Sequence, residues 1–137
     1  MSRPKGKPSA SLIDRMTGEA SWLLSHAQAL AGYGREPEAA EEWARASICE
    51  EQAAALLDAD GQELEAAIHR VSAASCCELL GQFVRAVTLL RAALSAPLRQ
   101  EYRGQVEQLL ARCLLAAQKE LSRDAKWRQR NRPSPVS

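Results

Sequence analysis

The 137-residue chain has few of the residues that build β-sheets. It contains five valines, three isoleucines and 4% aromatic residues, and these are the residue types that strands prefer. Alanine and leucine, which are strong helix formers, number 25 and 18. This composition excludes a sheet protein and predicts an all-α fold.

Long apolar runs are also missing. No stretch approaches the roughly 18 apolar residues that a membrane span requires. The basic residues near the N-terminus are not followed by an apolar segment of signal-peptide type. We therefore expect a cytoplasmic protein without membrane association, and at this length a single domain with one core.

Motifs that carry chemistry are scarce as well. The sequence has no glycine-rich phosphate loop and no Ser-His-Asp pattern at informative spacing. The candidate residues for metal or redox chemistry are His26, His69, Cys49, Cys76, Cys77 and Cys113. Cys76 and Cys77 are adjacent, so on a helix they point about 100° apart and do not chelate one ion together. We expect buried, reduced cysteines, a partly exposed His69, and no metal, cofactor or enzymatic activity; a small metal or redox enzyme is the least favoured alternative.

The net charge of +1 conceals a segregation of charge. Residues 1–9 and 125–137 carry seven basic residues and no acidic one, which leaves 11 basic and 17 acidic residues between them. We expect both basic segments to be disordered. The stretch from residue 35 to residue 65 contains ten carboxylates and only two basic residues, both arginines. We interpret this acidic stretch as a solvated helix face; the alternative is a surface that attracts basic peptides or repels nucleic acid.

Apolar residues recur at three- and four-residue spacing, which predicts amphipathic helices. Glycines and prolines interrupt the pattern near residues 32–34, 61, 81 and 97. The predicted helices cover about 10–32, 37–59, 62–80 and 83–95, and a fifth starts near Pro97 and frays around 122–128. Loops of two to four residues force neighbouring helices to be antiparallel. The expected folded domain spans 10–124.

Residues 80–97 have the sequence of a tight helical hairpin. One helix ends at Gly81, Phe83 opens the next, and Ala86 and Ala93 are small residues that let antiparallel helices approach closely. The same spacing recurs upstream in Gly34, Ala39, Trp43 and Ala46. Both stretches resemble the second half of a tetratricopeptide repeat (TPR).

The resemblance covers about 20–53 and 67–98 and implies a divergent TPR-like stack of about five antiparallel helices. Three features depart from the family. The two starts are 47 residues apart where the family has 34, Arg70 occupies a position that is usually large and apolar, and Ala73 is smaller than the usual leucine. A four- or five-helix bundle with convergent hairpins is the alternative architecture.

Tetratricopeptide repeats bind extended peptides or partner helices in a groove lined by the first helix of each pair. By position, the resemblance implies a partner-binding lining of Ser21, Leu24, Gln28, Ala31, Ile68, Val71, Ser75 and Leu79. The lysines and asparagines with which some family members clamp a C-terminal carboxylate are absent at these places. The mostly small and apolar lining suits an amphipathic helix or a second copy of the chain.

The three tryptophans have different expected places. Trp43 stands where the family has a core aromatic. Trp22 lies on a helix that is apolar around much of its circumference, so we expect it at the partner-docking surface or in a weak homodimer. Trp127 lies among basic residues and is expected to pack the last helix onto the bundle; the alternative is stacking on a base or a membrane headgroup.

The sequence therefore predicts a non-enzymatic interaction module, or adaptor, that binds a peptide or helix of another protein. The alternative is a nucleic-acid-associated helical protein that uses its basic tails on phosphates. The acidic body argues against nucleic acid, because like charges repel.

Overall fold

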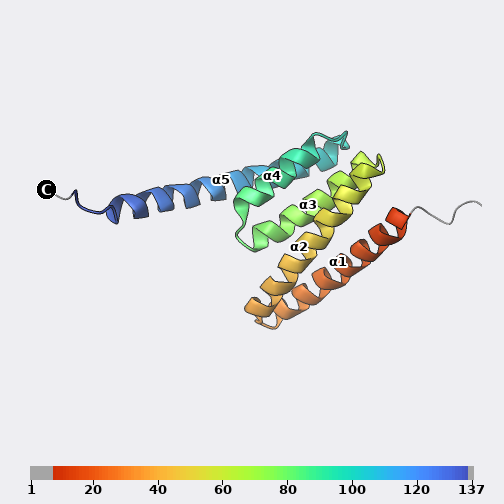
Figure 1. Cartoon of the computed structure of the whole chain (residues 1–137), viewed down its shortest axis with the longest axis horizontal. Coiled ribbons are helices and arrows are strands. Elements are labelled where there is room, and N and C mark those ends of the chain that lie inside the picture. The colour runs from red at the N-terminus through yellow and green to blue at the C-terminus, as the bar shows by residue number, and fades with distance from the viewer. Residues whose placement is uncertain (1–7, 136–137) are drawn as a thin grey trace, which may run out of the picture.

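The computed structural model describes residues 8–135, and within that range all regular structure is helical. The helices follow one another across the molecule in chain order (Figure 1). Their bounds are α1 (Pro8–Gly32), α2 (Glu36–Ala59), α3 (Glu63–Leu79), α4 (Phe83–Leu94) and α5 (Gln100–Arg130). The predicted all-α fold is confirmed, and the first four helices begin and end within two residues of the predicted positions. None of the described helices is both long and apolar enough to cross a membrane.

The two ends of the chain differ from the prediction. Helix α5 begins at Gln100 and continues to Arg130, so the tail predicted to be disordered from residue 125 is helical over 125–130. Two basic residues in its last turn suit the negative end of the helix dipole, and Asn131 caps it through two hydrogen bonds of 3.0 and 2.8 Å to the Trp127 carbonyl. Of the predicted disordered segment 1–9, Pro8 and Ser9 belong to α1, whereas residues 1–7 and 136–137 lie outside the described range.

Three of the four connections between helices are the same turn. Gly34, Gly61 and Gly81 have φ values of 77°, 77° and 73°, in the left-handed region that favours glycine. After each glycine, the next residue donates its N–H to the carbonyl five residues earlier, at 2.8 to 2.9 Å, which closes the helix in a Schellman motif. Five residues after each glycine stands a fully buried alanine: Ala39, Ala66 and Ala86. The sequence pattern had been recognised at two of these turns, and the turn at Gly61 is a third copy.

The fourth connection is longer and is held by hydrogen bonds from one arginine side chain. Arg103, in the first turns of α5, donates hydrogen bonds to the carbonyls of Leu94 and Ala96 at 3.1 and 2.8 Å. Leu94 is the last residue of α4, where a helix leaves backbone acceptors without partners, and the Ala96 carbonyl, two residues further on, also accepts the N–H of Leu98 at 2.8 Å. The arginine thereby satisfies the C-terminus of α4 and fixes the point from which α5 departs.

Small residues let consecutive helices pack closely. One core cluster joins α1 and α2 and includes Leu23 and the predicted core residue Trp43, which is buried. A second cluster joins α3, α4 and α5 and includes Ala86 and Ala93, both fully buried. The predicted burial of Trp43 and of both alanines is confirmed.

Side chains also join helices that are two apart in the chain. Arg85 of α4 forms an ion pair with Glu51 of α2. Arg112 of α5 donates two 3.1 Å hydrogen bonds to Glu78 of α3, and Cys76 of α3 packs into the cluster of α1 and α2. The helices therefore alternate between two layers, with α2 and α4 in one and α1, α3 and α5 in the other.

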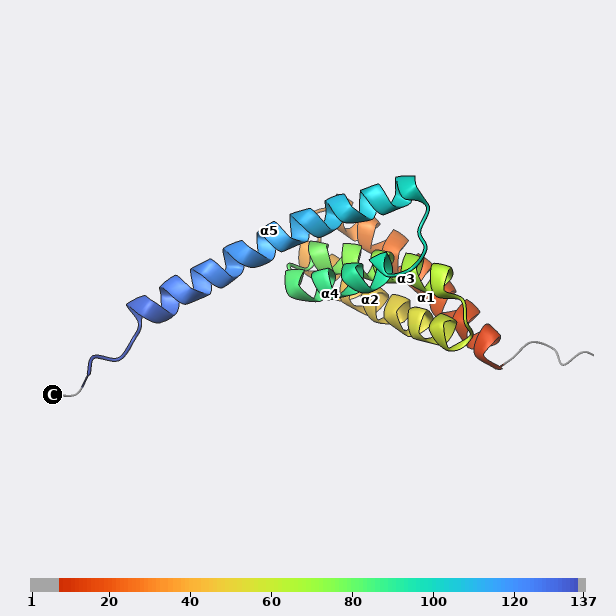
Figure 2. The ribbon, with the colours of Figure 1, turned by 90° about the horizontal axis from the view of Figure 1, so that it is seen from above.

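The last part of α5 has no neighbour among the described residues. Every residue from 118 to 130 is exposed, and this segment projects beyond the bundle in two perpendicular views (Figures 1 and 2). Trp127 is 61% exposed, so the expectation that it packs onto the bundle is wrong. We call residues 118–130 the α5 arm.

Replacing Ala86 with leucine is expected to lower the free energy of unfolding by about 1–3 kcal/mol, because the extra atoms overpack a closed contact. Ala86 has no exposed surface and packs in the cluster of α3, α4 and α5. Urea denaturation followed by circular dichroism measures the change. Ala92→Leu, at an exposed position of the same helix, serves as the control and should stay within about 0.5 kcal/mol of wild type. Equal stability of the two variants would contradict the tight hairpin.

Candidate functional site

The central helix α3 presents a line of apolar side chains to solvent. Leu64, Ile68 and Leu79 are 42%, 44% and 62% exposed, and Ser75 lies exposed between them. Their spacing places all four on one face, because residues 4, 7 and 11 apart fall close together around a helix. The opposite face carries the alanines and cysteines that pack on α2 and α4. We call these four residues the α3 stripe.

The structure brings together only part of the lining predicted on α3. Ile68, Ser75 and Leu79 belong to the α3 stripe, whereas Val71 is half-buried and packs against the cluster of α3, α4 and α5. Leu64 had not been included, although it lies one turn before Ile68 and extends the stripe. Its four-residue spacing was the sequence feature that could have found it.

The residues predicted on α1 divide between two faces. Ser21 and Gln28 are exposed and lie seven residues apart, on one face. Leu24 and Ala31 are half-buried against the cluster of α1 and α2, to which α3 contributes Cys76. The polar pair therefore remains available for a partner, while Leu24 and Ala31 act mainly in packing.

Trp22 lies on another face of α1, about 100° around the helix from Ser21. Its ring packs against His26, with 4.8 Å between ring centroids. The His26 ring nitrogen lies 2.6 Å from a carboxylate oxygen of Glu42 on α2, so this edge of the hairpin is tied together by polar contacts. Trp22 is therefore separated from the residues that share a face with Ser21, and its role in a weak homodimer stays a prediction.

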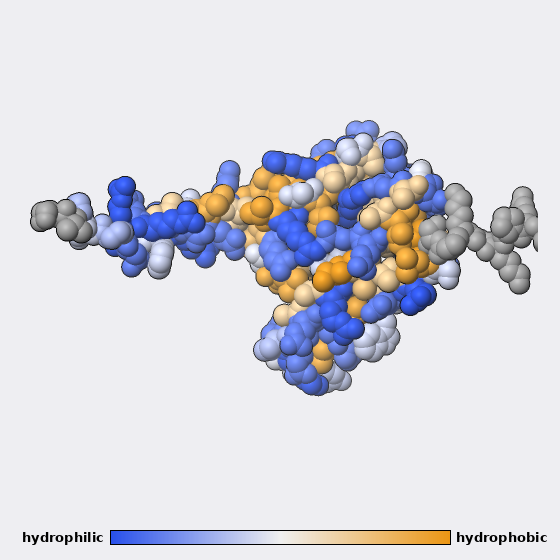
Figure 3. Space-filling model, in the orientation of Figure 1, coloured by the Kyte–Doolittle hydropathy of each residue, from blue (hydrophilic) through white to orange (hydrophobic). Residues whose placement is uncertain are grey.

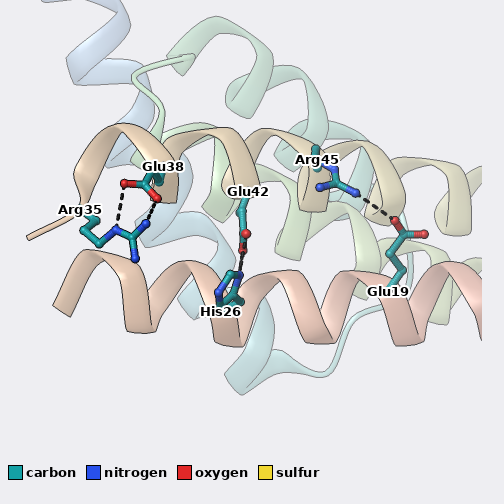
Figure 4. Close-up of polar contacts among 6 residues, drawn as sticks. All are labelled: Glu19, His26, Arg35, Glu38, Glu42 and Arg45. Atoms are coloured by element: carbon teal, nitrogen blue, oxygen red, sulfur yellow. Dashed lines mark hydrogen bonds and ion pairs between the residues drawn. The ribbon is translucent and has the colours of Figure 1, made fainter. Parts of the chain in front are cut away.

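A second polar contact ties the same two helices. Arg45 of α2 lies 3.7 Å from a carboxylate oxygen of Glu19 on α1. A local pair, Arg35 with Glu38, lies at the start of α2, where Arg35 is the N-cap residue. Figure 4 shows these contacts along one side of the hairpin, with the remaining helices behind it. This side is charged and internally paired, so it differs in character from the apolar α3 stripe.

A buried polar pair joins α2 to α3. Glu50 is only 5% exposed, and its Oε2 lies 2.6 Å from Nδ1 of His69. The hydrogen bond to Glu50 raises the pKa of His69 above its ordinary value of 6.5, and burial opposes this effect. A partly exposed His69 was predicted, but its partner was not, because the two residues are 19 positions apart on different helices. Since the pair is enclosed between the helices, we assign it to stability.

The acidic stretch is partly occupied by contacts between helices. Five of its ten carboxylates pair with basic side chains, and these are Glu38, Glu42, Glu50, Glu51 and Asp58. Their partners come from α1, α3 and α4 as well as from Arg35 at the start of α2. Arg70, which departs from the repeat pattern, pairs with Asp58. Four of the stretch's ten carboxylates therefore connect α2 with α1, α3 and α4.

All four cysteines are buried and free, which confirms the predicted burial. Loss of hydration raises the pKa of Cys76 to about 12 and that of Cys77 to about 11. At neutral pH these groups are thiols, which are poor nucleophiles and poor metal ligands. Within residues 8–135, no three His, Cys, Asp or Glu side chains are grouped in a way that could hold a metal ion.

No family model, no curated protein and no solved structure matches this chain. No site residue is therefore carried over from a relative. The candidate site rests on the α3 stripe, the exposed polar pair of α1 and the packing that positions them.

Proposed function

We propose that this chain is a non-enzymatic interaction module, built of TPR-like hairpins, that binds an amphipathic helix or peptide of another protein over the α3 stripe. The observation that carries the proposal is the stripe itself. Leu64, Ile68 and Leu79 are exposed on one face of the central helix. Partner helices dock through anchors at similar helical spacing, whereas scattered single exposed residues need no explanation.

The repeated turn supports the TPR-like part of the proposal. Three connections share one backbone geometry and one buried alanine position, and helices two apart in the chain are joined by side chains. Stacked helical hairpins have these properties. In such a stack the first helix of each pair contributes to one shared surface, which is the surface that binds peptides in the TPR family.

The residue types in the predicted lining favour an apolar partner over a carboxylate. Ser21 and Gln28 are exposed on α1, and on the α5 side Arg112 is engaged with Glu78. The side chains that replace the family's carboxylate clamp include Leu24 and Val71, both half-buried. An adaptor that recognises a helix by its apolar face fits this surface. The buried thiols suit a reducing compartment, and we therefore propose the cytoplasm.

The proposal is tested by comparing the double variant Ile68→Glu/Leu79→Glu with the control Val84→Glu, whose side chain is exposed on α4. Immobilised wild type and control should capture the same protein from an extract of the source cells, and the double variant should lose it. With the purified partner, the double variant should weaken binding by about tenfold or more, because charges replace two apolar anchors.

Circular dichroism melting of all three proteins shows whether the fold is intact. A partner that binds the double variant as tightly as wild type would exclude the α3 stripe as the docking surface. Capture that disappears equally in the control would also argue against it.

A further inference from the structure

We propose that the α5 arm binds the phosphate backbone of a single-stranded nucleic acid. The arm projects from the bundle with all of its residues exposed (Figures 1 and 2). Its surface is mostly hydrophilic in the space-filling view (Figure 3). This surface is separate from the α3 stripe, so the inference does not depend on the proposed function.

Four basic side chains share one face of the arm. Lys119, Arg123, Lys126 and Arg130 follow one another at spacings of four, three and four residues, which keeps them on one side of a helix. Lys119, Arg123 and Lys126 line one shallow hollow together with Leu115, Gln118 and Ser122. Within residues 8–135, none of the four cations forms an ion pair. We call these four residues the basic face.

The dimensions of the basic face suit a nucleic-acid strand. From Lys119 to Arg130 the helix rises about 16 Å, and a strand of the double helix places about five phosphates along such a length. The cations are regularly spaced along this length and free of internal partners. A regular array of unpaired cations complements a regular array of phosphates.

Trp127 adds a contact that phosphates do not explain. It is 61% exposed and lies beside the basic face, about 40° around the helix from Arg123. Exposed aromatic rings next to basic side chains stack on bases. Bases are free to stack on a side chain only where they are not paired in a duplex, so the combination favours a single strand.

The other faces of the arm argue against a membrane. Glu120 and Asp124 lie between Trp127 and Leu121 around the helix. A helix that lies in a membrane interface needs a continuous apolar face opposite its cations, and the two carboxylates interrupt it. The carboxylates of an acidic peptide can pair with the cations, but they provide no ring on which Trp127 can stack.

The acidic body does not prevent this binding. Three of the ten carboxylates in the acidic stretch, Glu38, Asp58 and Glu51, pair with arginines of the protein itself. The arm also carries the basic face outward from the bundle (Figure 1). Repulsion by exposed charges decays over a Debye length of about 8 Å at physiological ionic strength, so the distal arm is little affected.

The test measures fluorescence anisotropy of a labelled oligouridine of about 20 nucleotides with the full chain. If four phosphates are neutralised, binding should weaken about 50-fold when salt rises from about 50 to about 200 mM. Arg123→Gln/Lys126→Gln should weaken binding about tenfold or more and reduce the salt dependence. Trp127→Ala should weaken it about tenfold without changing that dependence.

The matched control is Arg91→Gln/Arg99→Gln, which removes two exposed cations outside the arm. It should bind within about twofold of wild type. Four results would overturn the proposal: no oligouridine binding at low salt, equal weakening in the control, preferential binding to phosphatidylserine vesicles, or equal binding to polyglutamate. Unchanged melting of all variants shows that the differences arise at the surface.

Discussion

Replacing Trp43 with alanine is expected to lower the free energy of unfolding by about 3–5 kcal/mol, enough to unfold a substantial fraction of the protein. Trp43 is 9% exposed and packs between α1 and α2 with Leu23 and Ala27. The loss has two parts. The free energy gained by burying the indole ring away from water is lost, and the small alanines around the site cannot fill the cavity that remains. Urea denaturation followed by circular dichroism measures the change.

Trp22 provides the matched control, because it is the same residue type in the same hairpin but 61% exposed. Trp22→Ala removes the ring contact with His26 and little buried surface. We expect it to change the free energy of unfolding by less than about 1 kcal/mol. If the two alanine variants were equally stable, the assignment of Trp43 to the core of the first hairpin would be wrong.

Replacing His69 with leucine is expected to lower the free energy of unfolding by about 3 kcal/mol near pH 6, because it leaves the Glu50 carboxylate buried without its partner. The carboxylate is 5% exposed, so water cannot take over the lost hydrogen bond. The pair His26 and Glu42 gives the control, because the His26 side chain is 44% exposed. His26→Leu should change stability by less than about 1 kcal/mol, since contacts of solvent-exposed groups contribute little.

The contribution of His69 should also depend on pH in a defined direction. Its pKa is raised in the folded protein above the ordinary 6.5 by the hydrogen bond to Glu50, so the folded chain holds the proton more tightly than the unfolded chain. The stabilisation is therefore complete below about pH 6.5 and is lost as pH rises through the raised pKa. Denaturation curves of wild type and His69→Leu across this range measure the difference between them. A difference that stayed constant or grew with pH would contradict the protonated pair.

The local elements of the fold were accessible from the sequence because their causes are local. Apolar residues at helical spacing predicted each of the first four helices, and glycines marked where they end. The left-handed conformation at Gly34 and Gly81 is a property of a few neighbouring residues, as is the closeness of helices at Ala86. The small size of alanine indicates a close approach of two helices even where the partner helix is not known.

The errors occurred where an outcome depends on what lies next to a helix. Composition alone suggested that residues 125–130 are disordered, but they continue α5. Trp127 was expected to pack on the bundle, yet it is exposed and belongs to the α5 arm, which projects beyond the bundle (Figure 2). The spacing of apolar residues predicts which face of a helix is apolar. It does not show how far along that helix the neighbouring helices extend.

The sequence by itself determined the helical class and the hairpin turns, since these follow from propensity and backbone conformation within one segment. The burial of Trp43 was expected from the resemblance to the repeat family, and that of the cysteines from their behaviour as small apolar residues. Only the tertiary structure decided which exposed residues share a surface and which charges meet. His69 meets Glu50 across two helices, Arg112 meets Glu78, and the α3 stripe stays uncovered because α2 and α4 pack on the other side of α3. These outcomes depend on the rotation and offset of whole helices, which are set by the summed packing of many small side chains.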